Sequence, residues 1–261
     1  MIGAIIGDIV GSRFEFHNTS RTDFELFTQD CDFTDDTICT VAVADAILHN
    51  KPFQDTLREW CHKYPNPMGA YGGSFNAWLQ SDTPQPYNSF GNGSAMRVSP
   101  CALAASSDAE AIRLAIASAS CTHNHPEGII GAVATALVIR ALSASRGRAL
   151  SALVDANSII ATYYGEDWYK HLPQPGVFDV TCQGCVPLAF IIVDKSHSFE
   201  DAIRTAVAYG GDSDTLAAIV GSMAEALWGV PDRLRDVIPA AYLPEEMMNI
   251  INKFYHTYAK I

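Results

Sequence analysis

The chain has 261 residues, enough for one large domain with a substantial core or for two small ones. Hydrophobic residues make up 48% of it and charged residues 18%, which excludes an intrinsically disordered protein. The formal net charge of -12 argues against a protein that binds nucleic acid or anionic lipid over its whole surface. A phosphate-bearing substrate would therefore need local compensation, from metal ions or from helix N-termini.

The N-terminal stretch predicts a helix over residues 2–11. Gly3, Gly7 and Gly11 recur at every fourth position among apolar residues, so they form a stripe along which another backbone can approach closely. Asp8 lies within this apolar surface, and we expect it to act as a structural acceptor or to hydrogen-bond the ligands of a site. The stretch lacks a positively charged start and contains this acid, which is not the pattern of a secretory signal.

Another acid, Glu15, lies between Phe14 and Phe16. It either faces solvent or occupies an apolar pocket, where its pKa would be raised toward the range of general acids and bases. The local sequence leaves both possibilities open.

Residues 33–37 read Phe-Thr-Asp-Asp-Thr and open a predicted helix over residues 35–49. Carboxylate and hydroxyl oxygens are the ligands that Mg²⁺, Mn²⁺ and Ca²⁺ prefer, and a cation would remove the repulsion between adjacent carboxylates. The same residue types also cap helices, because they accept hydrogen bonds from the amides of the first turn. The same choice arises for residues 210–215, which taken alone favour a helix cap over a metal site.

The central part of the chain alternates predicted helices with loops. Helical spacing of apolar residues predicts helices over residues 53–63, 108–121, 126–145, 150–164 and 198–209, and a short helix at Trp78 and Leu79. Predicted loops cover residues 81–94 and 165–185, and the apolar residues 186–193 fit either a strand or a buried helix.

Two loop segments carry candidate binding groups. In residues 91–100 glycines alternate with small polar residues, which exposes backbone amides to a phosphate or a sugar, although a plain turn also explains this composition. Arg97 in this segment is either a phosphate contact or a solvated charge. His123 and His125 precede a predicted helix, where they either bind a metal or another ligand or belong to a capped surface turn.

The seven cysteines are scattered and odd in number, which indicates free thiols in a reducing cytoplasm. Cys182 and Cys185 form a single C-x-x-C pair. A zinc site would need a second pair of ligands and a redox site would need a thioredoxin-like context, so neither role is assigned to them.

Near the other end of the chain, residues 210–215 read Gly-Gly-Asp-Ser-Asp-Thr and open a predicted helix that continues to Leu227. Their ligand types match those of residues 34–37 in nearly mirrored order, so the two helix starts are candidates for one shared metal site. A last helix is predicted over residues 245–258. Because alternating strands are almost absent, we predict an all-α fold with one compact domain spanning residues 1–261.

Four motifs in this order resemble those of the ADP-ribosylglycohydrolase family. They are Gly7-Asp8-x-x-Gly11 with Glu15, residues 33–37, Gly91-Asn92-Gly93-Ser94-Ala95-Met96-Arg97, and residues 210–215. Residues 122–127, Thr-His-Asn-His-Pro-Glu, are also similar to the family, and the resemblance covers nearly the whole chain. It implies an all-α fold that holds two divalent metal ions, Mg²⁺ or Mn²⁺.

The resemblance implies a role for each matching residue. The implied metal ligands are Thr34, Asp35, Asp36, Asp212, Asp214 and Thr215. The residues implied to contact ADP-ribose are Asn92, Gly93, Ser94, Met96 and either His123 or His125. Glu15 would lie near the metals and the scissile bond, and the proton would be handled by Glu15 or by a metal-bound aspartate, Asp35 or Asp212. Ser213 and Glu225 depart from the family pattern, in which threonine and glycine are common, and Glu225 puts the packing of its helix in question.

The implied activity is metal-dependent hydrolysis that releases ADP-ribose at the ribose anomeric carbon, with ADP-ribosyl-arginine on protein as the first choice of substrate. Open alternatives are another adduct (O-linked serine, nucleic acid or a small molecule), a different metallohydrolase reaction, a non-catalytic ADP-ribose-binding module, and a structural domain whose Asp and Thr clusters are caps. The expected partner is an ADP-ribosylated protein or another ADP-ribose adduct. No membrane or nucleic-acid partner is expected. The protein is expected to be a monomer.

Overall fold

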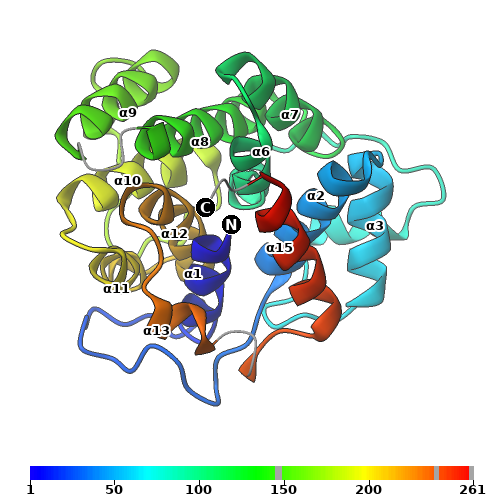
Figure 1. Ribbon diagram of the computed structural model, residues 1–261, viewed down its shortest axis with the longest axis horizontal. Coiled ribbons are helices and arrows are strands. Elements are labelled where there is room, and N and C mark those ends of the chain that lie inside the picture. Colours follow the sequence, from blue (N-terminus) through cyan, green and yellow to red (C-terminus); the bar gives the residue numbers. More distant parts are fainter. Residues whose placement is uncertain (145–148, 238–240, 259–261) are drawn as a thin grey trace.

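The computed structural model describes residues 1–144, 149–237 and 241–258, which form a packed set of helices (Figure 1). The helices are α1 (Ile2–Ser12), α2 (Asp35–His49), α3 (Phe53–Lys63), α4 (Gly73–Gln80), α5 (Gly93–Met96), α6 (Ser99–Ala104), α7 (Asp108–Ser120), α8 (Pro126–Ala144), α9 (Ala149–Tyr164), the 3-10 helix η1 (Trp168–Lys170), α10 (Cys182–Lys195), α11 (Phe199–Tyr209), α12 (Ser213–Trp228), α13 (Asp232–Arg235) and α15 (Glu245–Tyr258). Within these described ranges, extended backbone pairs only in two isolated bridges, Thr34 with Met68 and Gly91 with Thr181. The predicted all-α fold is confirmed.

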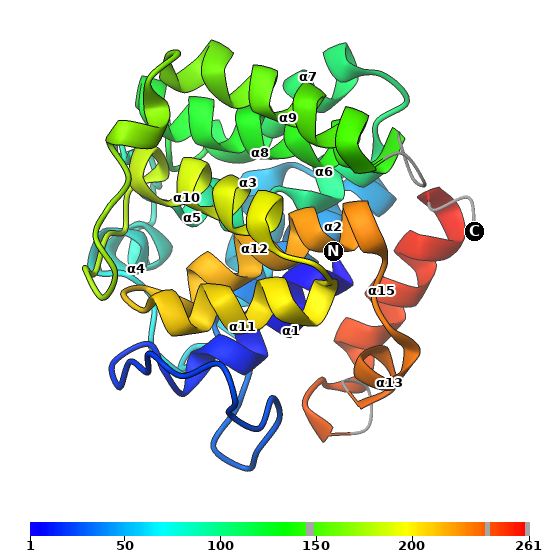
Figure 2. The ribbon, with the colours of Figure 1, turned by 90° about the vertical axis from the view of Figure 1, so that its left-hand side faces the viewer.

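Helices α1 and α12 lie side by side through the middle of the molecule (Figures 1 and 2). A β-carbon added at Gly7 would overlap the carbonyl oxygen of Ala217, and one added at Gly11 would lie 2.5 Å from the Cα of Asp214. Only glycine allows two backbones to approach this closely. The predicted glycine stripe is thus confirmed, and it brings the end of α1 against the start of α12.

Helices α7, α8 and α9 form a layer along one side of this central pair (Figure 2). In the described part of the chain, α8 is the one helix long and apolar enough to cross a membrane by length and composition. However, 61% of that window is buried inside the protein, where α8 packs against α7, α9 and α12. Its apolar surface is therefore used in the core, and a core helix passes the same test.

Helix α2 packs against α3, α6 and α15 and also touches α1. Side-chain caps fix where several of these helices begin. Thr34, Ser107, Thr181 and Ser198 each accept a hydrogen bond from a backbone amide in the first turn of the helix that follows. The cap at Thr34 matters most for the site, because it sets the direction of the two aspartates that follow.

Some segments predicted as loops are helical. Helices α5 and α6 lie within residues 91–104, α10 starts at Cys182, and α13 was not predicted. Helices α5 and α13 have only four residues each, too few to show a periodic pattern. Residues 184–190 of α10 are all buried, so the segment has no polar face to reveal its period. Of the two possibilities for residues 186–193, the buried helix is correct.

Candidate active site

A cavity of about 470 Å³ opens where the end of α1 meets the starts of α2, α5 and α12. Five carboxylates line it: Glu15, Asp35, Asp36, Asp212 and Asp214. The volume suits a small-molecule ligand. The two Asp and Thr clusters predicted from the sequence therefore converge on one site, although they are far apart in the chain.

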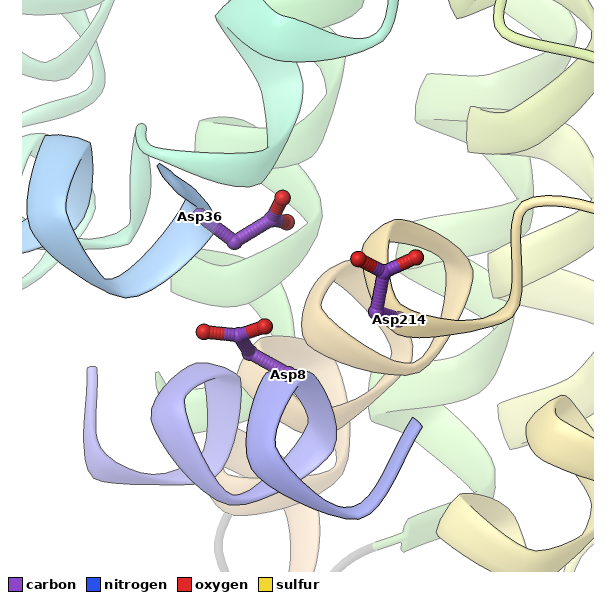
Figure 3. A group of neighbouring side chains, drawn as sticks. All are labelled: Asp8, Asp36 and Asp214. Atoms are coloured by element: carbon purple, nitrogen blue, oxygen red, sulfur yellow. The ribbon is translucent and has the colours of Figure 1, made fainter. Parts of the chain in front are cut away.

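Asp8, Asp36 and Asp214 point toward one another from α1, α2 and α12 (Figure 3). One carboxylate oxygen from each of the three lies within 4.8 Å of the others. Glu15, Asp212 and Asp214 form a second group with the same spacing. Asp214 belongs to both groups, so two sets of hard oxygen ligands adjoin at one residue.

Asp8 holds the start of α2 in place. Its Oδ2 accepts hydrogen bonds from the backbone nitrogens of Thr34 at 3.0 Å and Thr37 at 3.1 Å, and its Oδ1 accepts one from the Thr34 hydroxyl at 2.7 Å. Burial raises the pKa of Asp8 to about 6, although these hydrogen bonds lower it. The structure confirms Asp8 as a structural acceptor. It also places Asp8 within the acidic group, a position that the sequence alone did not reveal.

Two side-chain hydrogen bonds orient the start of α12. Asn92 Nδ2 donates to Asp212 Oδ2 at 2.6 Å, and Thr215 Oγ1 donates to Asp36 Oδ2 at 3.1 Å. The first bond joins α12 to the residue that precedes α5, and the second joins it to α2. Asn92, predicted to contact the ligand, therefore also positions one of the predicted metal ligands.

The acidic groups fit a divalent cation. Asp36 Oδ1 and Asp214 Oδ1 are buried and have no hydrogen-bond partner. Burial, followed by the charges of neighbouring carboxylates, raises the pKa of both residues well above the usual range. A buried carboxylate oxygen without a partner is costly, and a cation would both occupy it and neutralise the repulsion. Carboxylate and threonine oxygens are the ligands that Mg²⁺ and Mn²⁺ select.

Glu15 lies in the pocket rather than in solvent. Burial and then the charges of Asp212 and Asp8 raise the pKa of this half-buried carboxyl to about 7. Its side chain lies against Gly69, which has a left-handed φ of +77°, and a β-carbon there would come 2.5 Å from Glu15 Oε2. A carboxyl with this pKa changes protonation near neutral pH, as a general acid or base must.

Asn18, which the sequence analysis did not single out, holds the turn that carries Glu15. Its Nδ2 donates to the carbonyl oxygens of Phe14 at 2.7 Å and Gly211 at 3.0 Å, and its Oδ1 accepts from the Gly211 nitrogen at 2.7 Å. The turn after α1 is thereby fastened to the turn before α12. Asn18 follows Glu15 by three residues and belongs to no recognisable local motif, so no signal in the sequence revealed this role.

The cavity is also lined by Asn92, Gly93, Met96 and His123, all of which were predicted to contact the ligand. A β-carbon at Gly93 would lie 3.1 Å from His123 Nε2, so the ring reaches the glycine segment closely. Burial and the charge of Arg97 lower the pKa of His123 well below its usual range, which keeps the ring neutral.

Three predicted site residues are not among the described residues that line the cavity: Thr34, Ser94 and His125. Thr34 caps α2. The Ser94 hydroxyl donates to the Gly128 carbonyl at 2.6 Å, and His125 Nδ1 accepts from the Glu127 nitrogen at 3.1 Å at the start of α8. Of the two histidines, His123 is therefore the one that faces the cavity.

An exposed aromatic pair stands at the cavity next to Glu15. The rings of Phe16 and Phe178 are stacked, with centroids 6.0 Å apart and planes 13° apart, and both residues line the cavity. Phe16 is 65% exposed and Phe178 is 48% exposed. Exposed aromatic rings beside a cavity offer a flat apolar surface to a ligand. Their spatial pairing was not readable from the sequence.

The seven cysteines are free. The Cys182 thiol donates to the Gly91 carbonyl at 3.0 Å, and the Cys185 thiol donates to the Asp179 carbonyl at 3.1 Å. Among the described residues, neither belongs to a group of three metal-binding side chains. These bonds give the C-x-x-C pair a structural role beside the cavity.

The fold and the site together define an all-α protein with a carboxylate-lined cavity that fits a divalent cation. A family model described as ADP-ribosylglycohydrolase matches residues 1–260, and the chain belongs to this family. Members of the family are hydrolases that act on ADP-ribose glycosidic bonds.

The proteins similar to the chain include two curated relatives and one solved structure. The ADP-ribosyl-[dinitrogen reductase] glycohydrolase of Rhodospirillum rubrum is 25% identical over 271 residues, covering 95% of this chain and 89% of that protein. ADP-ribosylhydrolase ARH3 of Mus musculus is 28% identical over 172 residues, covering 53% of this chain and 46% of that protein. A structure titled ADP-ribosylglycohydrolase-related protein complex superposes with a TM-score of 0.75 at 21% identity, covering 98% of this chain and 95% of that one, which supports the fold.

Proposed function

We propose that this protein releases ADP-ribose from a modified acceptor by hydrolysis at the ribose anomeric carbon, in a reaction that requires divalent metal ions. The acceptor we propose is arginine on a protein. The observation that carries the proposal is the pair of acidic groups sharing Asp214 in the cavity, with buried carboxylate oxygens that lack partners. The Rhodospirillum rubrum relative, whose name specifies an ADP-ribosylated protein, aligns over 95% of this chain and supports a protein substrate.

Two metal ions, Mg²⁺ or Mn²⁺, are part of this proposal because two groups of oxygen ligands adjoin. From these two groups, Asp36, Asp212 and Asp214 would hold the ions. Asp35 and Thr215, which line the same cavity, would complete the set. The remaining members have other roles: Asp8 holds the start of α2, and Glu15 is left for proton transfer. When bound, such ions stabilise developing charge on substrate oxygens and lower the pKa of a bound water. They would also offset the negative charge of the chain, -12 in total, where a diphosphate binds.

Glu15 is the residue we propose for proton transfer. In the reaction, the bond from the anomeric carbon to the acceptor nitrogen breaks, a water oxygen bonds to that carbon, and a proton ends on the acceptor nitrogen. Glu15 is a half-buried carboxyl that lines the cavity, and a carboxyl at this position can take a proton from water and give one to the leaving nitrogen. Asp212 is less free for this task, because its Oδ2 already accepts a hydrogen bond from Asn92 at 2.6 Å.

The proposed test is release of free ADP-ribose from an arginine-ADP-ribosylated protein with Mg²⁺, with Mn²⁺ and with a chelator. We expect metal-dependent release by the natural protein and by the surface variant Asp155→Asn, and strong loss in Asp214→Asn. Release only from a serine-linked, nucleic-acid or small-molecule adduct would replace arginine as the acceptor. Binding of ADP-ribose without any release would identify a binding module instead. The absence of both binding and release would contradict the proposal as a whole.

We also propose that the protein is a monomer and that it works in a reducing cytoplasm. The seven free cysteines support the second of these proposals. Sedimentation of the purified protein with and without reductant tests the first part. A dimer that persists in reductant would contradict a monomeric state. Mass analysis of the thiols after isolation from cells under alkylating conditions tests the second.

A further inference from the structure

Three buried residues form a hydrogen-bond relay behind the cavity wall. Arg97 Nη2 donates to Thr122 Oγ1 at 2.8 Å, and Thr122 Oγ1 lies 2.7 Å from His123 Nδ1. Arg97 also donates to the Ser118 carbonyl at 2.9 Å. The exposed fractions of Arg97, Thr122 and His123 are 1%, 0% and 5%, so Arg97 is not a solvated charge.

The chemistry of these groups sets the direction of the relay. A guanidinium only donates, so Arg97 occupies a lone pair of Thr122 Oγ1 and leaves the single hydroxyl proton to be donated onward. His123 Nδ1 can accept that proton. The other neighbour of the hydroxyl is the Cys121 thiol, a weak acceptor that itself donates to the Ser118 carbonyl at 3.3 Å.

The opposite arrangement is unfavourable. If His123 carried its proton on Nδ1, that proton would point at Thr122 Oγ1, and the buried hydroxyl proton would lose its best acceptor. These contacts therefore favour the ring proton on Nε2. This nitrogen is the one next to the glycine segment, at 3.1 Å and 3.5 Å from the positions that β-carbons of Gly93 and Gly91 would occupy.

We propose that Arg97 and Thr122 are positioning residues that hold His123 as a neutral Nε2–H donor, directed at an acceptor oxygen of the ADP-ribose moiety. The inference rests on the proposed function for the identity of the ligand. It gives the acidic cavity a fixed donor where ionised carboxylates can only accept. It also gives a role to the buried guanidinium of Arg97: burial of the His123 ring, and then the positive charge of Arg97, lower the pKa of His123, so the ring stays neutral and keeps its donor-acceptor pattern.

The test is the protonation pattern of the His123 ring, read from nitrogen NMR of the ligand-free protein. The resonances are identified by their absence in His123→Asn. We expect the proton on Nε2 in the natural protein and in Thr122→Ser, and a mixture of tautomers in Thr122→Val. Calorimetry should show ADP-ribose binding about 3- to 10-fold weaker in Thr122→Val, the effect of one weakened hydrogen bond, and near normal in Thr122→Ser.

Thr135→Val is the matched control. Thr135 is fully buried in α8, and its hydroxyl has no hydrogen-bond partner, so this variant removes a buried hydroxyl outside the relay. It should change neither the ring pattern nor the affinity.

A proton on Nδ1 in the natural protein would overturn the inference, and so would an unchanged tautomer and affinity in Thr122→Val. If Thr122→Val does not fold, the natural protein and Thr122→Ser still decide the tautomer. That measurement needs no substrate, so it separates failure of the relay from failure of the proposed activity, which the ADP-ribose release assay reports.

Discussion

The hydroxyl of Thr215 donates to Asp36 Oδ2 at 3.1 Å, joining the first turns of two helices whose bonded residues are 179 positions apart in the chain. The other oxygen, Asp36 Oδ1, is buried without a partner. One oxygen of this carboxylate is therefore held in place while the other is left for a ligand. This arrangement favours a bound cation over the metal-free state.

Metal binding should stabilise the protein. At a concentration 100 times its Kd, a single Mg²⁺ or Mn²⁺ is expected to add about 2.7 kcal/mol to the free energy of unfolding. In Asp36→Asn and Asp214→Asn this increment should be largely lost, while the metal-free protein should be at least as stable as the natural one, because repulsion between carboxylates is reduced. Urea denaturation with metal and with chelator measures both effects, and an undiminished metal increment in Asp214→Asn would contradict the ligand assignment.

The metal-free protein should lose stability as the pH rises. Burial and neighbouring carboxylates raise the pKa of Asp35 to about 8 and that of Glu15 to about 7 in the folded state, against about 4 in an unfolded chain. Between these values the folded state binds more protons than the unfolded state, so the stabilisation present at low pH is lost toward pH 8. Urea midpoints in chelator should therefore fall from about pH 5 to about pH 8, with a shallower slope in Asp35→Asn. A midpoint that rises over this window would contradict the prediction.

Removing the proton-transfer group should impair turnover but not folding. Glu15→Gln is expected to lower kcat about 100- to 10,000-fold, the usual contribution of a general acid or base. Affinity for ADP-ribose and the thermal midpoint should change little, because the amide keeps the shape of the side chain. Glu166→Gln, at an exposed position, is the control and should retain full activity. A Glu15→Gln protein at the natural rate would remove Glu15 from the chemistry.

The contact between α1 and α12 should not tolerate a methyl group. Gly7→Ala would place a β-carbon into the Ala217 carbonyl, where only the backbone can yield, so a loss of about 3 kcal/mol or more is expected. Gly72→Ala is the control, because apart from the adjacent residues of the chain no atom lies within 4 Å of a β-carbon there. It should change stability by less than about 0.5 kcal/mol. Equal urea midpoints for the two variants would show that the helices can separate without cost.

The turn that carries Glu15 should depend on Asn18. Asn18→Ala removes the bonds to Gly211 and to the Phe14 carbonyl, which should lower stability by about 1 kcal/mol. It should lower kcat by roughly 10- to 100-fold, because Glu15 would no longer be held in position. Metal binding, measured by calorimetry, should remain. A variant that loses stability but keeps its full kcat would show that Glu15 is positioned by other contacts.

Local patterns in the sequence determined most of the helices, their caps and the chemical types of the candidate ligands. These features depend on neighbours within one or two helical turns, so they can be read from the sequence directly. Examples are the spacing of apolar residues in α2, the cap at Thr34, and the carboxylate pairs at the starts of α2 and α12. The glycine spacing in α1 likewise predicted a close backbone contact, although it did not indicate which helix would make that contact.

The tertiary structure alone decided how these parts combine. In the folded protein Asp8 belongs to the acidic group, Glu15 lies in the pocket, and His123 rather than His125 faces the cavity. Each of these outcomes depends on which helices pack against one another. A sequence records the residue types that a metal or a sugar needs, but only the packing of α1 on α12 brings carboxylates from opposite ends of the chain within 4.8 Å of one another. The repulsion between these carboxylates, and their ability to bind one cation together, depend on their distance in space and not on their order along the chain.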